Sequence, residues 1–452
     1  MTVDHIPSAS GLPVIGSMLE LRRGALQAYE RARAEHGDVV RFIAGPPGLR
    51  ATFYAVFSPQ GAQEVLATKA ADFGKDNQFY QEAREALGNG LLTSQHEDYQ
   101  RQRRLIQPLF TPRRVDLYAQ AIREEAGRMT TGWADAQDGV VDVLGETSRF
   151  ALRTVSRVLF GADAGEMIPA VRRCFPILST HTQRRGFAPR NVPRNWPTPA
   201  NLKADAAQAE LYEVCDQIIA ARDRQQQPTE TGTDLLAQLT GAEGADGERL
   251  DPVEIREHVL IFLLAGHETT ATALAFALHL LARHPAEQAE ARAEVDRVLG
   301  GAEPQAADVD RLPYLTMVLK EAMRLYPPAP AVGRRNKIAV EVDGRRIPAG
   351  SDVILVQWAL HRHPDHWEDP ERFDPTRFTE EKESARHRYA WLPFGGGPRA
   401  CIGRRFAMLE SVLALATVLR GHRIEAVDVD VPVEQGTTIS VRGPMRCRVV
   451  PR

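Results

Sequence analysis

The sequence predicts one large, mainly α-helical domain with a small β-rich lobe. The first observation is a clear helix start: Asp251 can cap the helix, Pro252 suits its first position, and Glu254 completes a capping-box spacing. The second is that no helix breaker follows until Pro285, while apolar residues cover nearly all faces of this helix. A long helix that is apolar all round lies in the middle of a large domain. We therefore expect residues 1–452 to form a single domain.

Composition places the chain among globular proteins and excludes several classes of function. Apolar residues make up 43% of the chain and charged residues 25%, and the net charge of −3 gives no reason to expect nucleic acid binding. The four cysteines have no paired spacing, so they predict neither a disulfide framework nor a zinc site and favour a reducing compartment. No signal peptide and no run of roughly 20 apolar residues is evident. We expect a soluble, cytoplasmic monomer without a membrane anchor.

The other elements follow from local patterns along the chain. Strands are expected near the start and in the last third, loops where glycine and proline gather, and helices where apolar residues recur at helical spacing. The expected strands are 39–43, 50–57 and 351–360, the loops 184–199 and 240–251, and the helices 286–301 and 312–328. Residues 338–347 alternate around Asp343 and Gly344, which is a strong signal for a two-residue β-hairpin.

The segment FGGGPRACIG, residues 394–403, places Cys401 behind three glycines, a proline and an arginine. Beyond it, apolar residues recur at helical spacing until Gly421, so Cys401 lies just before a helix N-terminus. Unpaired N–H groups and the helix dipole there lower the pKa of a thiol. Arg399 offers a cationic fork to a carboxylate or phosphate. These features suit a thiolate metal ligand whose cofactor carries anionic groups, although a lone cysteine is more commonly a buried core residue.

This segment resembles the haem-binding signature F-x-x-G-x-R-x-C-x-G of the cytochrome P-450 haem-thiolate monooxygenases. Its fixed positions are filled by Phe394, Gly397, Arg399, Cys401 and Gly403. The resemblance implies that Cys401 is the axial ligand of the iron of haem b, that Phe394 shields the sulfur, and that Arg399 pairs with a haem propionate. Thiolate ligation favours O–O bond cleavage. The expected fold is that of the family, with haem between the long central helix and the Cys401 loop.

The segment AGHETT, residues 265–270, lies in the middle of the long helix. Taken alone, Thr269 could bond back to a carbonyl one turn earlier and bend the helix. The resemblance implies an acid–alcohol pair instead, in which the Thr269 hydroxyl bonds iron-bound dioxygen and Glu268 relays protons. It also places Ala265 beside haem and substrate, and suggests that Gly266 leaves room there for substrate or oxygen.

Glu321 and Arg324 lie three residues apart on one helix face, which by periodicity is an ordinary surface ion pair. The resemblance implies a buried structural triad that supports the haem pocket. Its third member would be Arg372, in the PERF segment at residues 370–373.

Further cofactor contacts are implied by the segment HEDYQRQRRLIQP, residues 96–108. The resemblance makes Arg103 a propionate ligand, with Tyr99 in the place of the usual tryptophan or histidine and His96 as an alternative contact. Arg334, ten residues before Gly344, matches a position that supplies another propionate-binding arginine.

We therefore expect a monooxygenase that inserts one oxygen atom from O2 into a hydrophobic small molecule such as a terpene, steroid, fatty acid or polyketide. The expected substrate contacts are residues 76–92, 187–196, 265, 327–333 and 437–438. Alternatives are a peroxide-driven enzyme, a coupling or desaturating haem-thiolate enzyme, and a non-catalytic haem sensor.

No reductase is fused to the chain, so electrons from NAD(P)H are expected to come through a separate ferredoxin or flavodoxin-like donor and its reductase. A basic patch beside the Cys401 loop is expected to steer this acidic donor. Its members are Arg101, Arg104, Arg113, Arg114, Arg404 and Arg405.

Overall fold

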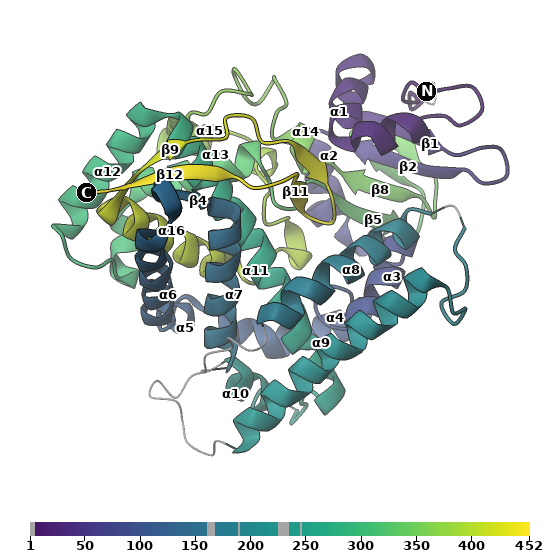
Figure 1. The fold of residues 1–452 in the computed structure, drawn as a ribbon. Coiled ribbons are helices and arrows are strands. Elements are labelled where there is room, and N and C mark those ends of the chain that lie inside the picture. Colours follow the sequence, from purple (N-terminus) through teal and green to yellow (C-terminus); the bar gives the residue numbers. More distant parts are fainter. Residues whose placement is uncertain (1–4, 161–167, 189, 225–234, 245) are drawn as a thin grey trace.

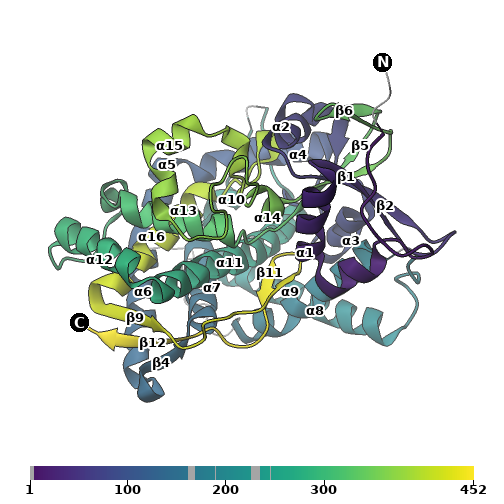
Figure 2. The same cartoon turned by 90° about the horizontal axis from the view of Figure 1, so that it is seen from above.

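Helix α11 (Pro252–Arg283) crosses the middle of the protein and is buried over most of its length (Figures 1 and 2). The computed structural model describes residues 5–160, 168–188, 190–224, 235–244 and 246–452. The predicted capping box is present: the Asp251 side chain accepts from the Glu254 N–H at 2.9 Å, and the Glu254 side chain accepts from the Asp251 N–H at 3.1 Å. The sequence therefore predicted both the start and the burial of the central helix.

The largest core cluster surrounds the C-terminal half of α11. It is built from apolar residues of α11, α6 (Ala119–Gly132), α7 (Val143–Phe160), α13 (Pro313–Leu325) and α16 (Arg404–Gly421). A second cluster packs the N-terminal half of α11 against α8 (Ile168–Gly186) and α9 (Pro199–Arg224). In Figure 1, α8 and α9 lie on the opposite side of α11 from α12.

The remaining helices of the described chain are mostly shorter. They are α1 (Met18–His36), α2 (Pro59–Gln63), α3 (Gln78–Leu87), α4 (His96–Ile106), α5 (Pro112–Asp116), α10 (Leu235–Thr240), α12 (Pro285–Leu299), α14 (Gln357–Leu360) and α15 (Glu380–Ala385). Helix α12 ends where Gly300 adopts the left-handed conformation, as glycine at a helix C-terminus permits.

The β-rich lobe contains a five-stranded sheet in the order β1-β2-β8-β5-β3. Its strands are β1 (Val39–Ala44), β2 (Ala51–Val56), β3 (Phe73–Gly74), β5 (Val332–Asn336) and β8 (Asp352–Leu355). Strands β2 and β8 are parallel, with Phe53 opposite Asp352 and Val56 opposite Leu355, and the other neighbours are antiparallel. Helix α1 packs on this lobe, and its residues Leu26 and Tyr29 share a core cluster with Phe42 of β1.

Smaller sheets complete the fold. A three-stranded sheet has the order β4-β12-β9, and two further pairs are β6–β7 and β10–β11. Their strands are β4 (Val140–Asp142), β6 (Val340–Val342), β7 (Arg345–Ile347), β9 (His422–Ala426), β10 (Val433–Gln435), β11 (Ile439–Val441) and β12 (Arg446–Pro451).

The predicted hairpin around Asp343 and Gly344 is confirmed, with φ angles of 49° and 71° at its two turn residues. The strand predicted over 351–360 is only half correct. It ends at Leu355, and residues 357–360 form the short helix α14 instead. In the predicted loops, Pro189 and Ala245 lie outside the described residues.

Among the described residues, α11 is the one helix long and apolar enough to cross a membrane, judged by length and composition. Most of that apolar stretch is buried among the surrounding helices. The hydrophobicity of α11 is thus accounted for by its place in the core.

Candidate functional site

The Cys401 loop is fixed by a close backbone approach that only glycine permits. Gly397 has a φ of 66°, and a Cβ at this position would lie 1.7 Å from the carbonyl oxygen of Leu66. The N–H of Cys401 donates to the Phe394 carbonyl at 2.9 Å, and α16 begins at Arg404 directly after the loop. The predicted position of Cys401 just before a helix N-terminus is confirmed.

Cys401 differs from the other cysteines in its accessibility. Cys174, Cys215 and Cys447 are buried, whereas Cys401 is exposed. Burial raises the pKa of Cys174 to about 11, and those of Cys215 and Cys447 to about 12. Of the four thiols, only that of Cys401 can therefore be offered to a bound group.

The electrostatic surroundings of Cys401 contain opposing influences. Although the residue is exposed, the protein atoms around its sulfur raise the pKa, because desolvation disfavours the thiolate. The N–H of Gly403 and the charges of Arg103 and Arg404 lower the pKa, but by less. The expectation of a net lowered pKa is therefore wrong for the chain on its own. A thiol in this state loses its proton when it binds a metal cation.

Helix α4 supports the loop from the side. Arg103 donates from Nη1 to the carbonyl of Ala400 at 2.9 Å, and the Tyr99 hydroxyl donates to the carbonyl of Pro398 at 2.8 Å. The Arg399 guanidinium lies 3.8 Å from the centre of the Tyr99 ring. His96 is the first residue of α4, where it is exposed and has a φ of 47°. The structure thus brings Arg103, Tyr99 and Arg399 together around the loop.

Buried cations gather beside this loop. Arg334 and Lys75 are both buried, and Lys75 donates from Nζ to the Leu92 carbonyl at 2.7 Å. Burial and the nearby charges of Arg334 and Arg399 hold the pKa of Lys75 well below its ordinary value. Burial likewise lowers the pKa of Arg399 to about 10, with Arg334 and Arg84 as further causes.

This cluster has an excess of positive charge that no carboxylate offsets. Within the described parts of the chain, no ion pair with Asp or Glu reaches Lys75, Arg334 or Arg399. Buried charges are normally paired, so the cluster fits a ligand with anionic groups. A haem would suit both halves of the site, since Cys401 would hold its iron and these cations would hold its propionates. Lys75 was missed by sequence analysis, because nothing in its local sequence separates it from a surface lysine.

The acid–alcohol pair lies in the middle of α11. Burial raises the pKa of Glu268, and the hydroxyl of Thr438 partly offsets this effect. The Thr269 hydroxyl donates to the carbonyl of Ala265 at 2.8 Å, which is the local bond that sequence analysis had weighed against a chemical role. Because Ala265 and Thr269 are four residues apart, they share one face of the helix, and Ala265 is exposed there.

Gly266 does not open space for a ligand as expected. A Cβ at this position would lie 3.0 Å from Cγ2 of Val155 on α7, so the missing side chain faces a packed helix. Glycine at position 266 instead lets α7 and α11 approach closely.

Apolar packing links α11 to the Cys401 loop. Ile402, next to Cys401, packs against the cluster that contains Leu260, Leu263 and Leu264 of α11. The Cys401 loop and the N-terminal half of α11 therefore border the same apolar cluster.

The predicted ionic triad exists, but with a different third member. Arg324 binds both carboxylate oxygens of Glu321, at 2.6 and 2.8 Å, and both side chains are fully buried. The third guanidinium is that of Arg377, whose Nε lies 3.4 Å from Glu321 Oε1. The assignment of Arg372 is wrong: its side chain is exposed, and only its backbone carbonyl accepts a bond from Arg324, at 3.1 Å.

A signal for Arg377 was present in the sequence. The tetrapeptide PTRF at residues 375–378 repeats the pattern of PERF at 370–373 five residues later. In the fold the first arginine points outward, whereas the second lies in a short 3-10 turn that packs on α13.

The regions expected to contact substrate lie around the same helix. Thr438, in the β10–β11 turn, reaches Glu268. On α3, Phe79 packs its ring 5.6 Å from that of Phe187, which is 55% exposed. Trp196 is 59% exposed and contributes little to the core.

The chain matches the family model described as Cytochrome P450 over residues 6–448. It is 36% identical to cyclooctatin synthase of Streptomyces melanosporofaciens, over 99% of this chain and 96% of that protein. It is 34% identical to pentalenene oxygenase of Streptomyces avermitilis, over 97% of this chain and 95% of that protein. The crystal structure of the cytochrome P450DA haem domain superposes with a TM-score of 0.87 at 30% identity, covering 99% of this chain and 98% of that one.

Proposed function

The chain belongs to the cytochrome P450 family, and from this premise we propose that it oxygenates a terpene-like small molecule with electrons from a separate donor protein. As a member, it is a haem-dependent monooxygenase that uses O2. The substrate class is supported by the names of the two Streptomyces relatives. We further propose that the protein acts as a cytoplasmic monomer.

The observation that carries the proposal is the exposed residue Cys401 beside cations that no carboxylate of the described residues offsets. Cys401 would hold the iron of haem b, and Arg399, Arg334 and Lys75 would hold its propionates. Arg103 and Tyr99 support the loop through its carbonyls. Haem supplies the binding and activation of O2, which the side chains of this protein cannot perform.

The chain's own contribution to the chemistry would be proton delivery. Because burial raises the pKa of Glu268, this carboxyl holds a proton more readily than an exposed acid does and can release it inside the protein. The Thr269 hydroxyl can pass on a proton only if it exchanges its bond to the Ala265 carbonyl for one to a ligand. The same pair argues against a peroxide-driven enzyme or a sensor, neither of which needs protons delivered.

The test is turnover of pentalenene under ¹⁸O2 with NADPH, a surrogate ferredoxin and its reductase. We expect a product that carries one ¹⁸O atom, and its yield should not change when catalase removes peroxide. A product that vanishes with catalase would establish the peroxide-driven alternative. If pentalenene changes the absorption spectrum of the haem-loaded protein but no oxygenated product forms, the proposal is contradicted for this substrate class.

A second arm tests the proton-delivery pair. Thr269→Ala should release most reducing equivalents as peroxide, because proton-transfer groups contribute about 10²–10⁴-fold to such steps. Thr269→Ser, which keeps the hydroxyl, is the matched control. If both variants couple NADPH oxidation to product equally well, Thr269 has no role in proton delivery and only bonds the carbonyl of its own helix.

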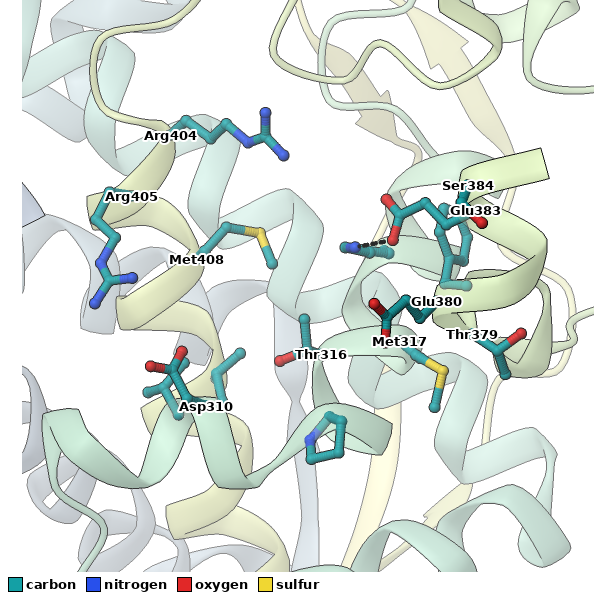
Figure 3. A pocket seen from close by; sticks show the side chains of 15 residues that line it. Asp310, Thr316, Met317, Thr379, Glu380, Glu383, Ser384, Arg404, Arg405 and Met408 are labelled. Carbon is teal, nitrogen blue, oxygen red and sulfur yellow. Dashed lines mark hydrogen bonds and ion pairs between the residues drawn. The ribbon is translucent and has the colours of Figure 1, made fainter. Parts of the chain in front are cut away.

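The electron donor would dock beside a groove next to the Cys401 loop (Figure 3). The groove has a volume of about 920 Å³ and lies between α13, α15 and the start of α16. Figure 3 shows Arg404 and Met408 on one side, facing Glu380 and Glu383 on the other. Arg404 follows Cys401 by three residues, so a donor bound here would lie near the thiolate side of the haem.

The basic patch expected from the sequence is weaker than its arginine count implied. Arg101 pairs with Glu254, Arg104 with Glu248 at 2.7 Å, and Arg405 with Asp116 at 3.0 Å. Such pairs remove most of the positive potential that would steer a partner. Among the described residues Arg113, Arg114 and Arg404 form no ion pair. Of these three, Arg404 lines the groove, which makes it the strongest candidate contact for an acidic donor.

A further inference from the structure

The proposed function leaves unused a buried acid at the centre of the protein, Glu410 on α16. Its side chain is fully buried, and within the described residues neither carboxylate oxygen has a hydrogen-bond partner. Its neighbours along the helix, Leu409 and Val412, belong to the apolar core. An acid in such a place calls for an explanation, because a buried polar group without a hydrogen-bond partner destabilises the folded protein.

The polar groups that face Glu410 come from two other helices. They are the hydroxyls of Thr154 on α7 and Thr270 on α11, and both residues are buried. The hydroxyl of Thr154 likewise has no hydrogen-bond partner among the described residues. No Lys, Arg or His of the described chain forms an ion pair with Glu410. The three side chains form a small polar cluster, Glu410–Thr154–Thr270, inside an apolar core.

The surroundings of this acid favour its protonated form. Burial raises the pKa of Glu410 well above its ordinary value, and the two hydroxyls offset this only in part. A protonated carboxyl is both a donor and an acceptor. It can therefore interact with both threonine hydroxyls without placing a charge in the core.

Thr270 connects this cluster to the turn of α11 that carries the proton-delivery pair. Thr270 directly follows Glu268 and Thr269, and its side chain is buried. One residue further, the carbonyl of Ala271 accepts a bond from the Thr147 hydroxyl of α7 at 3.0 Å. The turn of α11 that carries the proton-delivery pair is therefore bonded to α7 through Ala271, and the Glu410 carboxyl of α16 lies close enough to Thr270 to affect the same turn.

We propose that Glu410 is a positioning residue for the oxygenation: as a neutral acid on the helix that follows Cys401, it fixes the turn of α11 that carries Glu268 and Thr269. The inference rests on the proposed monooxygenase function. Residues on one turn move together, so a shift at Thr270 displaces the Thr269 hydroxyl. A misplacement of about 1 Å can cost an enzyme 10²-fold in rate.

Infrared difference spectroscopy of the haem-loaded protein tests directly whether the Glu410 carboxyl is protonated. The wild type should show a C=O stretch of a protonated carboxylic acid that Glu410→Gln lacks, whereas any such band from Glu268 should be equal in both proteins. If the wild type and Glu410→Gln do not differ in this region of the spectrum, the proposal is overturned. This measurement needs no substrate, so it is independent of whether pentalenene is oxygenated.

Coupling then tests the positioning role, measured as peroxide released per NADPH oxidised with pentalenene and the surrogate donor. Glu410→Gln keeps a neutral hydrogen-bonding side chain and should couple as the wild type does. Glu410→Met and Thr270→Val should release several-fold more peroxide while retaining haem. Thr417→Val is the control, because the hydroxyl of this buried threonine of α16 bonds, among the described residues, only the Leu413 carbonyl of its own helix, at 2.8 Å.

Two outcomes in this second test would overturn the proposal. If Glu410→Gln is as uncoupled as Glu410→Met, the acid acts through its proton and not through its position. If Thr270→Val couples normally, the turn is not held through Thr270; this variant decides the question even if Glu410→Met fails to fold. Failure of the wild type to oxygenate pentalenene would count against the proposed substrate class alone.

Discussion

Cys401 is exposed while the three other cysteines are buried, and this difference gives the first prediction. Cys401→His should keep some haem but lose the far red-shifted Soret band of the reduced, CO-bound protein, since that band depends on a thiolate ligand. Cys174→Ser, Cys215→Ser and Cys447→Ser should keep it wherever they fold. Absorption spectroscopy checks this prediction. An unchanged band in Cys401→Ala would show that Cys401 is not the ligand of the iron.

At the same scale, the sequence was most informative where chemistry requires a particular atom. Cys401 and Arg399 were proposed because they stand in a motif of unusual residue types and spacing, and Thr269 was proposed from the resemblance to the family; their roles stay predictions. The proposed roles of Lys75 and Glu410 could not be predicted, because they depend on burial among residues that are distant in the sequence. The error at Gly266 has the same origin: a missing side chain has a direction, and only the packing of α7 shows it.

The Cys401 loop provides a prediction at the scale of the element. Gly395 and Gly397 both have a φ of 66°, but a Cβ at 395 meets nothing within 4 Å, whereas one at 397 collides with Leu66. Gly395→Ala should therefore cost only the left-handed strain of about 1–2 kcal/mol. Gly397→Ala should displace the loop and lower the haem content far more. Haem per polypeptide is the measurement, and equal losses would show that strain and not the collision governs the loop.

The ionic triad allows a similarly matched comparison. Arg377→Met removes one cation from the buried Glu321, and breaking a buried pair of this kind costs about 3 kcal/mol or more. Arg372→Met changes an exposed side chain and should stay within about 0.5 kcal/mol of the wild type. The free energy of unfolding in urea, measured for both variants, shows which of the two arginines belongs to the triad. A larger effect at Arg372 would restore the assignment made from the sequence.

Elements were predicted well where local signals are strong and poorly where they depend on distant partners. The capping box of α11 and the Asp343–Gly344 turn are local, and both are present. The strand over 351–360 was drawn too long, because pairing with β2 and β5 supports it only as far as Leu355. The apolar residues after Leu355 belong to α14 instead, and Trp358 of this helix lies in the same core cluster as Tyr29 of α1.

At the scale of the whole molecule, the proposed donor site yields a comparison of two arginines. Arg404→Glu should slow reduction by an acidic ferredoxin, and added salt should slow the wild type in the same way, because exposed charges are screened within about 8 Å at physiological ionic strength. Arg104→Glu should have little effect, since Arg104 is already paired with Glu248. Stopped-flow reduction measures both. Equal sensitivity of the two variants would place the donor elsewhere.

The parallel pairing of β2 with β8 has a consequence for how the protein is made. Val56 and Leu355 are neighbours in the sheet, yet most of the chain lies between them. At about 5–20 residues per second on the ribosome, the β1–β2 hairpin waits on the order of 15–60 s for β8 to emerge. During that time the edge of β2 is unpaired, and such an edge can pair with another nascent chain. Slower translation lengthens this exposure, so the yield of folded protein should depend on the speed of synthesis and on chaperones that cover the hairpin, and ribosome-stalled chains that end before Asp352 should leave the hairpin open to protease.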